Sequence, residues 1–270
     1  MPTPPTTPSP STPRPVAIVT GGLRGIGLAT ARQLARDGFD LAVIDLAPPG
    51  PDCEAVLASL AEHGGRARYH PLDIADLARH DDTLAQIEHD LGPLCCLVNN
   101  AGIAARPLTD LLELAPAAFD RSLDVNLRGS FFLTQAFARR LLAMPVDPAL
   151  CRSIVFVTSI AAEMASTDRA QYCVSKAALS MTARLFAARL APHGVAVHEV
   201  RPGFIQTDMT ASAGSATIDQ WIAEGRVPMP RWGKPEDVGL AISTLASGRM
   251  PYITGQPFWI AGGLNIARAT

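Results

Sequence analysis

The alternation of strand-like and helix-like segments constrains this chain more than any other feature. Short runs rich in β-branched and apolar residues occur at 16–20, 41–46, 67–72, 95–100, 153–159, 195–203 and 257–262. Longer segments between them repeat their apolar residues about every 3.6 positions, as amphipathic helices do. Strands that alternate with helices pair in parallel through right-handed crossovers. The pattern therefore predicts an α/β fold, a doubly wound parallel sheet with helices on both faces.

The expected helices span 26–38, 53–65, 81–92, 118–144, 175–194 and about 236–246, and four of them end in glycine, at Gly38, Gly64, Gly92 and Gly194. A glycine at this position favours the left-handed conformation that ends a helix. No break in composition separates a second domain, so residues 15–270 are expected to form one domain. Seven prolines among the first 15 residues predict an extended tail over 1–14 instead of a signal peptide, with a protein-binding role as the alternative.

Composition excludes several classes of function. The net charge is −2, which gives no reason to expect a nucleic-acid or anionic-membrane partner. No run of 18 apolar residues is present that would span a bilayer. The five cysteines have no metal-ligand spacing, so we expect free thiols, a cytoplasmic protein and no metal site.

A glycine-rich loop, TGGLRGIG, joins the first strand to the first helix. Gly21, Gly25 and Gly27 follow the pattern GxxxGxG, with Arg24 and Ile26 between them. Glycines at this turn let a pyrophosphate approach the free backbone N–H groups at a helix N-terminus. A plain strand-to-helix turn is the alternative, but the loop's place after the first strand favours dinucleotide binding.

Acidic and amide side chains follow the next strands. Asp45 lies 20 residues after Gly25, where a carboxylate can accept both ribose hydroxyls. Asp73 follows the third strand and could serve an adenine amino group, cap the next helix, or do both. The run NNAG ends the fourth strand at the ligand-binding edge of such a sheet and includes Asn100, Ala101 and Gly102.

Tyr172 stands four residues before Lys176 in QYCVSKAALS, so both side chains lie on one face of the expected helix. One interpretation is a surface tyrosine on a lysine stem. The other is an acid–base pair, in which the lysine charge lowers the pKa of the phenol. The pair alone does not decide between these interpretations.

TGxxxGxG, NNAG, Ser159 thirteen residues before Tyr172, YxxxK and RPGFIQTDM occur in this order, and together they resemble the short-chain dehydrogenase/reductase family. The resemblance covers about residues 15–264 and implies a Rossmann-type fold, a nicotinamide cofactor and four catalytic residues, which would here be Asn126, Ser159, Tyr172 and Lys176. Capping is the alternative role for Ser159, and a helix kink is the alternative for Asn126.

By the same resemblance, cofactor contacts are expected from the glycine loop, from Asp45, from the following strand ends and from PGFIQT. These positions are Gly21, Arg24, Gly25, Ile26, Gly27, Asp45, Leu46, Asp73, Ile74, Asn100, Ala101, Gly102, Tyr172, Lys176, Pro202, Gly203, Ile205 and Thr207. Residues 208–232 resemble the family's variable substrate loop. Asp45 favours NAD, whereas Arg24 is of the kind that accompanies NADP. NAD is the expected cofactor.

The resemblance implies an NAD(P)-dependent oxidoreductase that acts on a secondary alcohol or a ketone. The alternative within the family is an NADPH-dependent 3-oxoacyl carrier-protein reductase, for which Arg106, Arg128 and Arg169 are candidate carrier contacts. A cofactor-sensing binding protein without turnover is the alternative outside enzymes, but such proteins typically lose the tyrosine or the lysine. Apolar faces on the helices at 118–144 and 170–191 predict a homotetramer, with a dimer as the second choice.

Overall fold

The computed structural model describes residues 14–145, 150–211 and 215–267, and within them seven parallel strands form one sheet in the order β3-β2-β1-β4-β5-β6-β7. The strands are β1 (Val16–Thr20), β2 (Asp40–Asp45), β3 (Ala67–Pro71), β4 (Leu94–Asn99), β5 (Arg152–Val157), β6 (Val195–Pro202) and β7 (Pro257–Ile260). β1 lies between β2 and β4, so the chain reverses its direction of travel across the sheet there. In open α/β sheets, ligands bind at this switch point, beyond the carboxyl ends of the strands.

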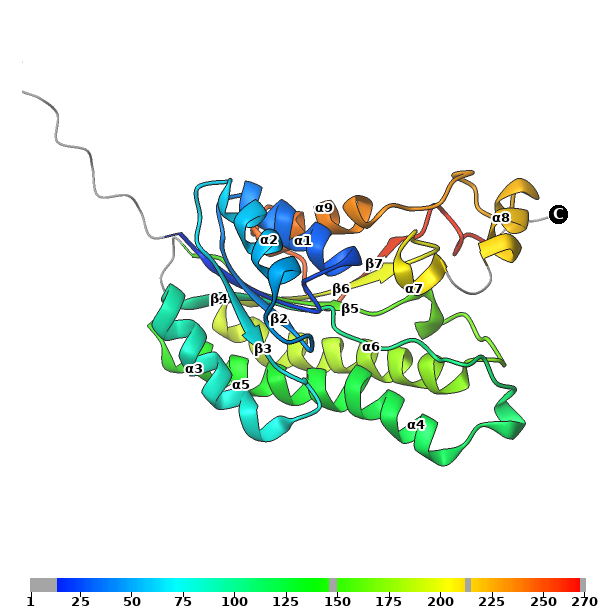
Figure 1. Cartoon of the computed structure of the whole chain (residues 1–270), viewed down its shortest axis with the longest axis horizontal. Helices are drawn as coiled ribbons and strands as arrows, with labels where there is room; N and C mark the ends of the chain where they lie inside the picture. Colours follow the sequence, from blue (N-terminus) through cyan, green and yellow to red (C-terminus); the bar gives the residue numbers. More distant parts are fainter. Residues whose placement is uncertain (1–13, 146–149, 212–214, 268–270) are drawn as a thin grey trace, which may run out of the picture.

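Helices cover both faces of the sheet, as the alternation predicts (Figure 1). One face carries α1 (Gly25–Arg36), α2 (Pro51–Ala61) and α9 (Pro235–Ala246), and the other carries α3 (His80–Leu91), α5 (Ser130–Ala143) and α6 (Ala170–Leu190). The short helices α7 (Asp208–Ala211) and α8 (Ser215–Ala223) lie beyond the carboxyl ends of the strands, and α4 (Pro116–Leu123) leads towards α5. The doubly wound fold is thus confirmed.

Alternate side chains of β1 pack into two separate hydrophobic cores, one on each face of the sheet. Val16 and Ile18 of β1 pack into the core beneath α3, α5 and α6. Ala17 and Val19 pack into the core beneath α1, α2 and α9. All four are essentially inaccessible to solvent, which explains why the strand reads as continuously apolar. The four glycines expected at helix ends all have positive φ angles, so their residue type is required there.

The expected helix over 118–144 is not continuous. Asp124–Gly129 forms a π-helical segment between α4 and α5. One extra residue per turn rotates the side chains of this segment relative to a straight helix, and such segments occur frequently at functional sites. The interpretation of Asn126 as lying in a kinked helix is therefore correct in its geometry, and the segment buries Asn126 completely.

The end of the last strand differs from its predicted position, and most of the predicted N-terminal tail is not described by the structure. The last strand ends at Ile260 and not at residue 262, because Gly262 and Gly263 have positive φ angles and leave the sheet. The tail predicted over 1–14 lies, apart from Arg14, outside the described residues. The single domain over 15–270 stays a prediction. None of the helices in the described ranges is long and apolar enough to cross a membrane.

Candidate active site

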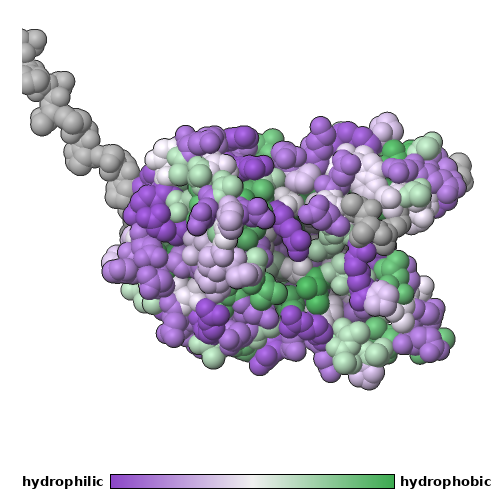
Figure 2. Space-filling view, in the orientation of Figure 1, coloured by the Kyte–Doolittle hydropathy of each residue, from purple (hydrophilic) through white to green (hydrophobic). Residues whose placement is uncertain are grey.

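A cavity of about 580 Å³ opens beyond the carboxyl ends of the strands. Its wall includes every residue expected to bind cofactor except Gly27, and three of the four expected catalytic residues: Ser159, Tyr172 and Lys176. The space-filling view shows this face as mostly hydrophilic, with hydrophobic residues near its centre (Figure 2). One space therefore connects the glycine loop with the YxxxK motif, about 150 residues further along the chain.

The glycine loop has the shape that a pyrophosphate cradle requires. Gly21 and Gly25 have φ angles of +64° and +54°, a backbone conformation that residues other than glycine rarely adopt. Gly27 lies behind the loop and not in the cavity wall, because a Cβ there would stand 2.0 Å from the carbonyl oxygen of Gly21. The residues present therefore fit a dinucleotide, with bare backbone facing the cavity at the start of α1.

Asp45, at the end of β2, lies beside this loop. Its two carboxylate oxygens accept hydrogen bonds from the backbone N–H groups of Leu23, at 3.2 Å, and Leu46, at 2.8 Å. The side chain of Leu46 is 64% exposed, and Arg24 reaches the same cavity. Both the acid that favours NAD and the arginine that would favour NADP therefore border the cavity, which leaves the conflict between them open.

Asp73 borders the cavity but does not cap the next helix, whose first residue follows Asp76. Its Oδ1 accepts a hydrogen bond from the backbone N–H of Ala75 at 2.9 Å, and Arg121 lies 3.6 Å from Oδ2. The next residue, Ile74, is buried and also lines the cavity. The side chain of Asp73 thus stabilises a turn before the helix, and its contact with an adenine amino group stays a prediction.

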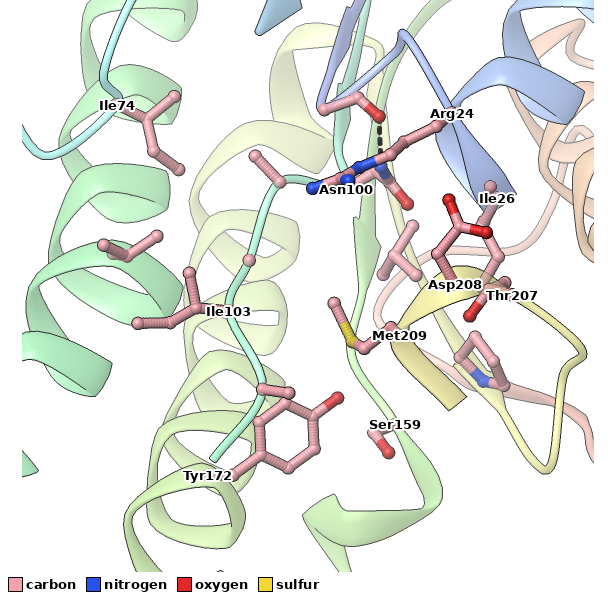
Figure 3. A pocket seen from close by; sticks show the side chains of 18 of the residues that line it. Arg24, Ile26, Ile74, Asn100, Ile103, Ser159, Tyr172, Thr207, Asp208 and Met209 are labelled. Atoms are coloured by element: carbon pink, nitrogen blue, oxygen red, sulfur yellow. Dashed lines mark hydrogen bonds between the residues drawn. The ribbon is translucent and has the colours of Figure 1, made fainter. Parts of the chain in front are cut away.

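Asn100 fastens the NNAG segment to the glycine loop. Its side-chain amide donates to the carbonyl oxygens of Thr20, at 2.9 Å, and Gly21, at 3.1 Å (Figure 3). The hydroxyl of Thr20 in turn accepts hydrogen bonds from the backbone N–H groups of Asn100 and Ala101, both at 3.0 Å. Thr20 was not anticipated as a site residue, since its role depends on a contact across two strands.

Asn126 lies behind the cavity wall instead of in it. Its Oδ1 accepts from the backbone N–H of Ile103 at 2.7 Å, and its Nδ2 donates to the carbonyl oxygen of Ile103 at 3.0 Å and to Ser175 Oγ at 3.1 Å. These two hydrogen bonds between Asn126 and Ile103 hold the segment after Gly102 against the π-helical turn. Every polar atom of the buried amide has a partner, as burial requires.

Tyr172 and Ser159 face one another across the cavity, with Met209 beside them (Figure 3). Ser159 also performs the capping role considered for it, because its Oγ accepts from the backbone N–H of Ala161 at 3.1 Å. Burial raises the pKa of Tyr172, and the hydrogen bond with Ser159 and the charge of Arg169 oppose that rise. The phenol is therefore protonated near neutral pH in this arrangement.

The expectation that Lys176 lowers the pKa of Tyr172 is wrong for this structure. The ammonium lies 5.6 Å from the centre of the tyrosine ring and donates a hydrogen bond to the carbonyl oxygen of Val157 at 2.9 Å. Burial lowers the pKa of Lys176 itself to about 8. Desolvation thus outweighs the attraction between the two side chains and moves each group towards its neutral form.

The PGFIQT segment follows β6 and borders the cavity through Pro202, Gly203, Ile205 and Thr207. A Cβ on Gly203 would lie 2.8 Å from the Cα of Ala261, so this turn packs closely on the chain after β7. Of the expected substrate loop, the residues around α7 line the cavity, while residues 212–214 lie outside the described ranges. Arg106 donates a hydrogen bond to the carbonyl oxygen of Met209 and so joins the two sides of the opening.

Several cavity residues were not anticipated from the sequence. Apolar residues from strand ends, loops and helical segments contribute most of them: Ile44, Leu72, Ile103, Ala104, Val125, Val157 and Met209. Thr158, Asp208, Thr210 and Arg121 add polar groups. Asp208, Met209 and Thr210 lie in the expected substrate loop without an assigned role, whereas for the others only adjacency to Ser159 or to the NNAG run could have suggested some.

Comparison with known proteins agrees with the site. A family model described as enoyl-(acyl carrier protein) reductase matches residues 21–265. A 3-oxoacyl-[acyl-carrier-protein] reductase of Synechocystis sp. is 35% identical over 250 residues, covering 92% of this chain and 96% of the relative. The chain belongs to the short-chain dehydrogenase/reductase family. It is accordingly an oxidoreductase that acts on a CH–OH or ketone group with a nicotinamide cofactor.

Two solved structures of this family extend the comparison. A 3-oxoacyl-[acyl-carrier protein] reductase from Brucella melitensis, in complex with NAD, is 44% identical with a TM-score of 0.91, covering 96% of this chain and 100% of the other. A relative from Agrobacterium tumefaciens with bound NADP is 32% identical with a TM-score of 0.80, covering 93% and 96%. These relatives between them bind both forms of the cofactor.

Proposed function

We propose that this short-chain dehydrogenase/reductase transfers a hydride between NAD(H) and a ketone or secondary alcohol held between Ser159 and Tyr172. The observation that carries the proposal is that one cavity borders the glycine loop, Asp45, Ser159, Tyr172 and Lys176. Its shape suits a long ligand with the adenosine end at Asp45 and the reacting end at Tyr172. When bound there, the nicotinamide supplies or accepts the hydride.

The chain's own residues would handle the proton and the orientation. Ser159 would donate a hydrogen bond to the substrate oxygen, and Tyr172 would deliver the proton in reduction and accept it in oxidation. A positioned acid or base of this kind contributes about a hundred- to ten-thousand-fold in rate. Burial raises the pKa of Tyr172, so the phenol carries the proton that it would deliver to a ketone oxygen. Lys176 would bind the ribose hydroxyls, and Asn126 would hold the Ile103 backbone against the site.

We propose NAD(H) in preference to NADP(H). A 2′-phosphate beside Asp45 would meet a like charge, and two unit charges at roughly 4 Å interact by about 4 kcal/mol at an effective dielectric of about 20. Leu46 adds no cation next to the acid. Arg24 could attract a phosphate but would leave the repulsion in place. The Brucella relative bound to NAD is consistent with this preference.

The substrate class that the relatives favour is a 3-oxoacyl thioester. An acidic carrier protein would need a cation at the opening. Arg128 pairs with Asp124, and Arg169 lies 3.7 Å from Asp168. Arg106 is exposed and borders the cavity, and the described residues supply no carboxylate for it. Of the three arginines considered, Arg106 is therefore the best candidate for the carrier contact.

Turnover measurements test these proposals. NADH and NADPH oxidation would be followed with a panel of simple ketones, oxidised polyols and 3-oxoacyl thioesters on a carrier protein or on a short thiol. Arg106→Glu should raise KM for the carrier-bound thioester and leave KM for the short thioester unchanged. Equal turnover of simple ketones and thioesters, with no effect of Arg106→Glu, would contradict the thioester assignment.

We also propose that the enzyme is a cytoplasmic homotetramer. Val174, Met181 and Leu185 of α6 are each about half exposed, and Phe132 and Leu142 of α5 are more than a third exposed. So much apolar surface on neighbouring helices is typical of a subunit contact. All five cysteines are free, as in a reducing compartment. Light scattering that gives the single-chain mass of 28.5 kDa at micromolar concentration would contradict the assembly.

A further inference from the structure

A buried ion pair lies directly beneath the catalytic end of the cavity. Glu199 and Arg201, two residues apart on β6, point to the same side of the sheet, and their side chains are 0% and 1% exposed. Arg201 Nε donates to Glu199 Oε1 at 2.5 Å. Two fully buried charges on a strand that is otherwise largely apolar are costly to desolvate. Their presence is therefore not explained by a gain in the free energy of unfolding.

Each carboxylate oxygen of Glu199 also ties down an element that carries site residues. Oε1 accepts from the hydroxyl of Thr158 at 2.8 Å, and Thr158 is the residue before Ser159. Oε2 accepts from the hydroxyl of Ser180 at 2.8 Å. Ser180 lies one turn after Lys176 and two turns after Tyr172 on α6. Glu199 thus joins the segment of Ser159 to the helix of Tyr172 and Lys176.

Arg201 completes the connection on the other side. Its Nη2 donates to Ser180 Oγ at 2.9 Å, and its Nη1 pairs with Glu163, at the end of the short helical turn that Ser159 caps. Its guanidinium lies over the ring of Trp259 on β7, 5.0 Å from the ring centre. Both ends of the segment 158–163 are therefore held by one buried pair.

We propose that Glu199 and Arg201 are positioning residues, which fix the hydroxyl of Ser159 at its distance from Tyr172 by clamping segment 158–163 to α6. This inference rests on the proposed function, because it assigns the pair a role in placing the acid–base group. A small outward movement of the segment would lengthen the contact between Ser159 and the phenol, and misplacement of catalytic groups by about 1 Å can cost a hundredfold in rate.

The sequence shows the two charges in VAVHEVRPG but not what they contact. Thr158 directly follows β5, Glu163 directly follows η4 (Ile160–Ala162), and Ser180 lies in α6. The order of these elements along the chain gives no sign that they meet on β6. The network has no described polar contact with Asp45 or the glycine loop. Loss of the pair should therefore leave cofactor binding intact.

The test compares Glu199→Gln with a matched control, Asp40→Asn. Asp40 is a buried carboxylate at the amino end of β2, with Arg66 Nε donating to it at 2.8 Å, and it does not border the cavity. Both changes neutralise a buried carboxylate that pairs with an arginine, although the side chain of Arg66 is half exposed and that of Arg201 is buried. Four quantities would be measured: the melting temperature, kcat, the dissociation constant of NAD, and the pH at which Tyr172 ionises.

Ionisation of Tyr172 can be followed without turnover. The chain contains three tyrosines, of which Tyr252 is fully exposed and burial raises the pKa of Tyr69 to about 12. The ultraviolet absorbance of phenolate in a background that carries both Tyr69→Phe and Tyr252→Phe therefore reports on Tyr172 alone. This readout remains informative even if the wild type shows no turnover with the panel above, which would count against the proposed function alone.

Glu199→Gln should lower kcat at least about tenfold, leave the dissociation constant of NAD within about twofold, and raise the pH at which Tyr172 ionises, since the hydrogen bond from Ser159 is lost. Asp40→Asn should lower the melting temperature comparably without changing kcat or that ionisation. Equal effects of the two variants on kcat and on the tyrosine, or no effect of Glu199→Gln on either, would overturn the proposal.

A milder variant covers the case in which Glu199→Gln does not fold. Thr158→Val keeps the shape of the side chain and removes only the hydroxyl that donates to Glu199. Like Glu199→Gln, it should raise the pH at which Tyr172 ionises. Thr158→Ser, which retains the hydroxyl donor, should restore the wild-type value of that pH. Wild-type ionisation and kcat in Thr158→Val would equally overturn the proposal.

Discussion

The ammonium of Lys176 donates a hydrogen bond to the carbonyl oxygen of Val157, 2.9 Å away, in a site where the lysine is 4% exposed. Val157 is the last residue of β5, so the lysine is held to the strand end that leads into Ser159. Burial lowers its pKa from 10.5 to about 8. The buried position of the lysine thus places its ammonium in the site but lowers the stability of the fold, because the charge has lost its contact with water.

Lys176→Met should abolish turnover and stabilise the fold at pH 7. Below pH 8 the lysine is charged in the folded and unfolded chains alike, and the folded chain bears the full cost of burying the charge. At about 1.4 kcal/mol per pKa unit, that cost is about 3 kcal/mol. Between pH 8 and 10.5 only the folded chain loses its proton, so the free energy of unfolding of the wild type rises and the advantage of the variant disappears. Urea unfolding of the wild type and the variant at pH 7 and at pH 10.5 measures this difference.

Tyr172→Phe should remove nearly all activity and leave cofactor binding intact. The ring keeps its packing and only the hydroxyl is lost, so we expect a fall in kcat of about a hundred- to ten-thousand-fold. Fluorescence titration with NADH would measure binding, and a coupled assay would measure kcat. A variant that retained half of the wild-type turnover would show that another group supplies the proton.

Asp45→Ser should weaken the preference for NAD over NADP. The serine removes the charge that a 2′-phosphate would meet, while Arg24 stays available to attract that phosphate. Dissociation constants for NADH and NADPH in the wild type and the variant give the result directly. Tighter binding of NADPH by the wild type would show that Arg24 dominates, and an unchanged ratio in the variant would show that Asp45 is not at the ribose.

His198 should make the fold sensitive to acid. Its side chain is buried on β6, and burial lowers its pKa from 6.5 to about 4. The folded chain therefore binds this proton less readily than the unfolded chain, and stability is lost as the pH falls from 6.5 to 4. The loss amounts to about 3 kcal/mol at about 1.4 kcal/mol per pKa unit.

His198→Leu has no titratable group at this position, so its stability should decline less over that interval. Urea unfolding at pH 7 and pH 4.5 compares the two chains, and the test is the slope with pH rather than the absolute stability. Parallel slopes for the wild type and the variant would assign the acid sensitivity to other groups.

The sequence by itself determined the α/β order, the parallel sheet and most of the cavity wall. These features follow from local rules: apolar periodicity sets each element, crossovers set the parallel pairing, and the carboxyl ends of parallel strands then meet at one edge. Gly21, Asp45 and Asn100 could therefore be placed together although they are far apart along the chain, and the family resemblance added Tyr172. The positive φ angles of Gly38, Gly64, Gly92 and Gly194 were predictable as well, because a helix end favours glycine in the left-handed conformation.

Only the tertiary structure decided the protonation of the site and the packing that supports it. The direction of the pKa shifts of Tyr172 and Lys176 depends on how completely both groups are buried, and burial is a property of the whole fold. The π-helical turn at Asn126 and the clamp of Glu199 on Thr158 and Ser180 join elements with no regular spacing in the sequence. A sequence pattern records which residues recur along one element, whereas contacts between elements arise from the packing of the folded chain.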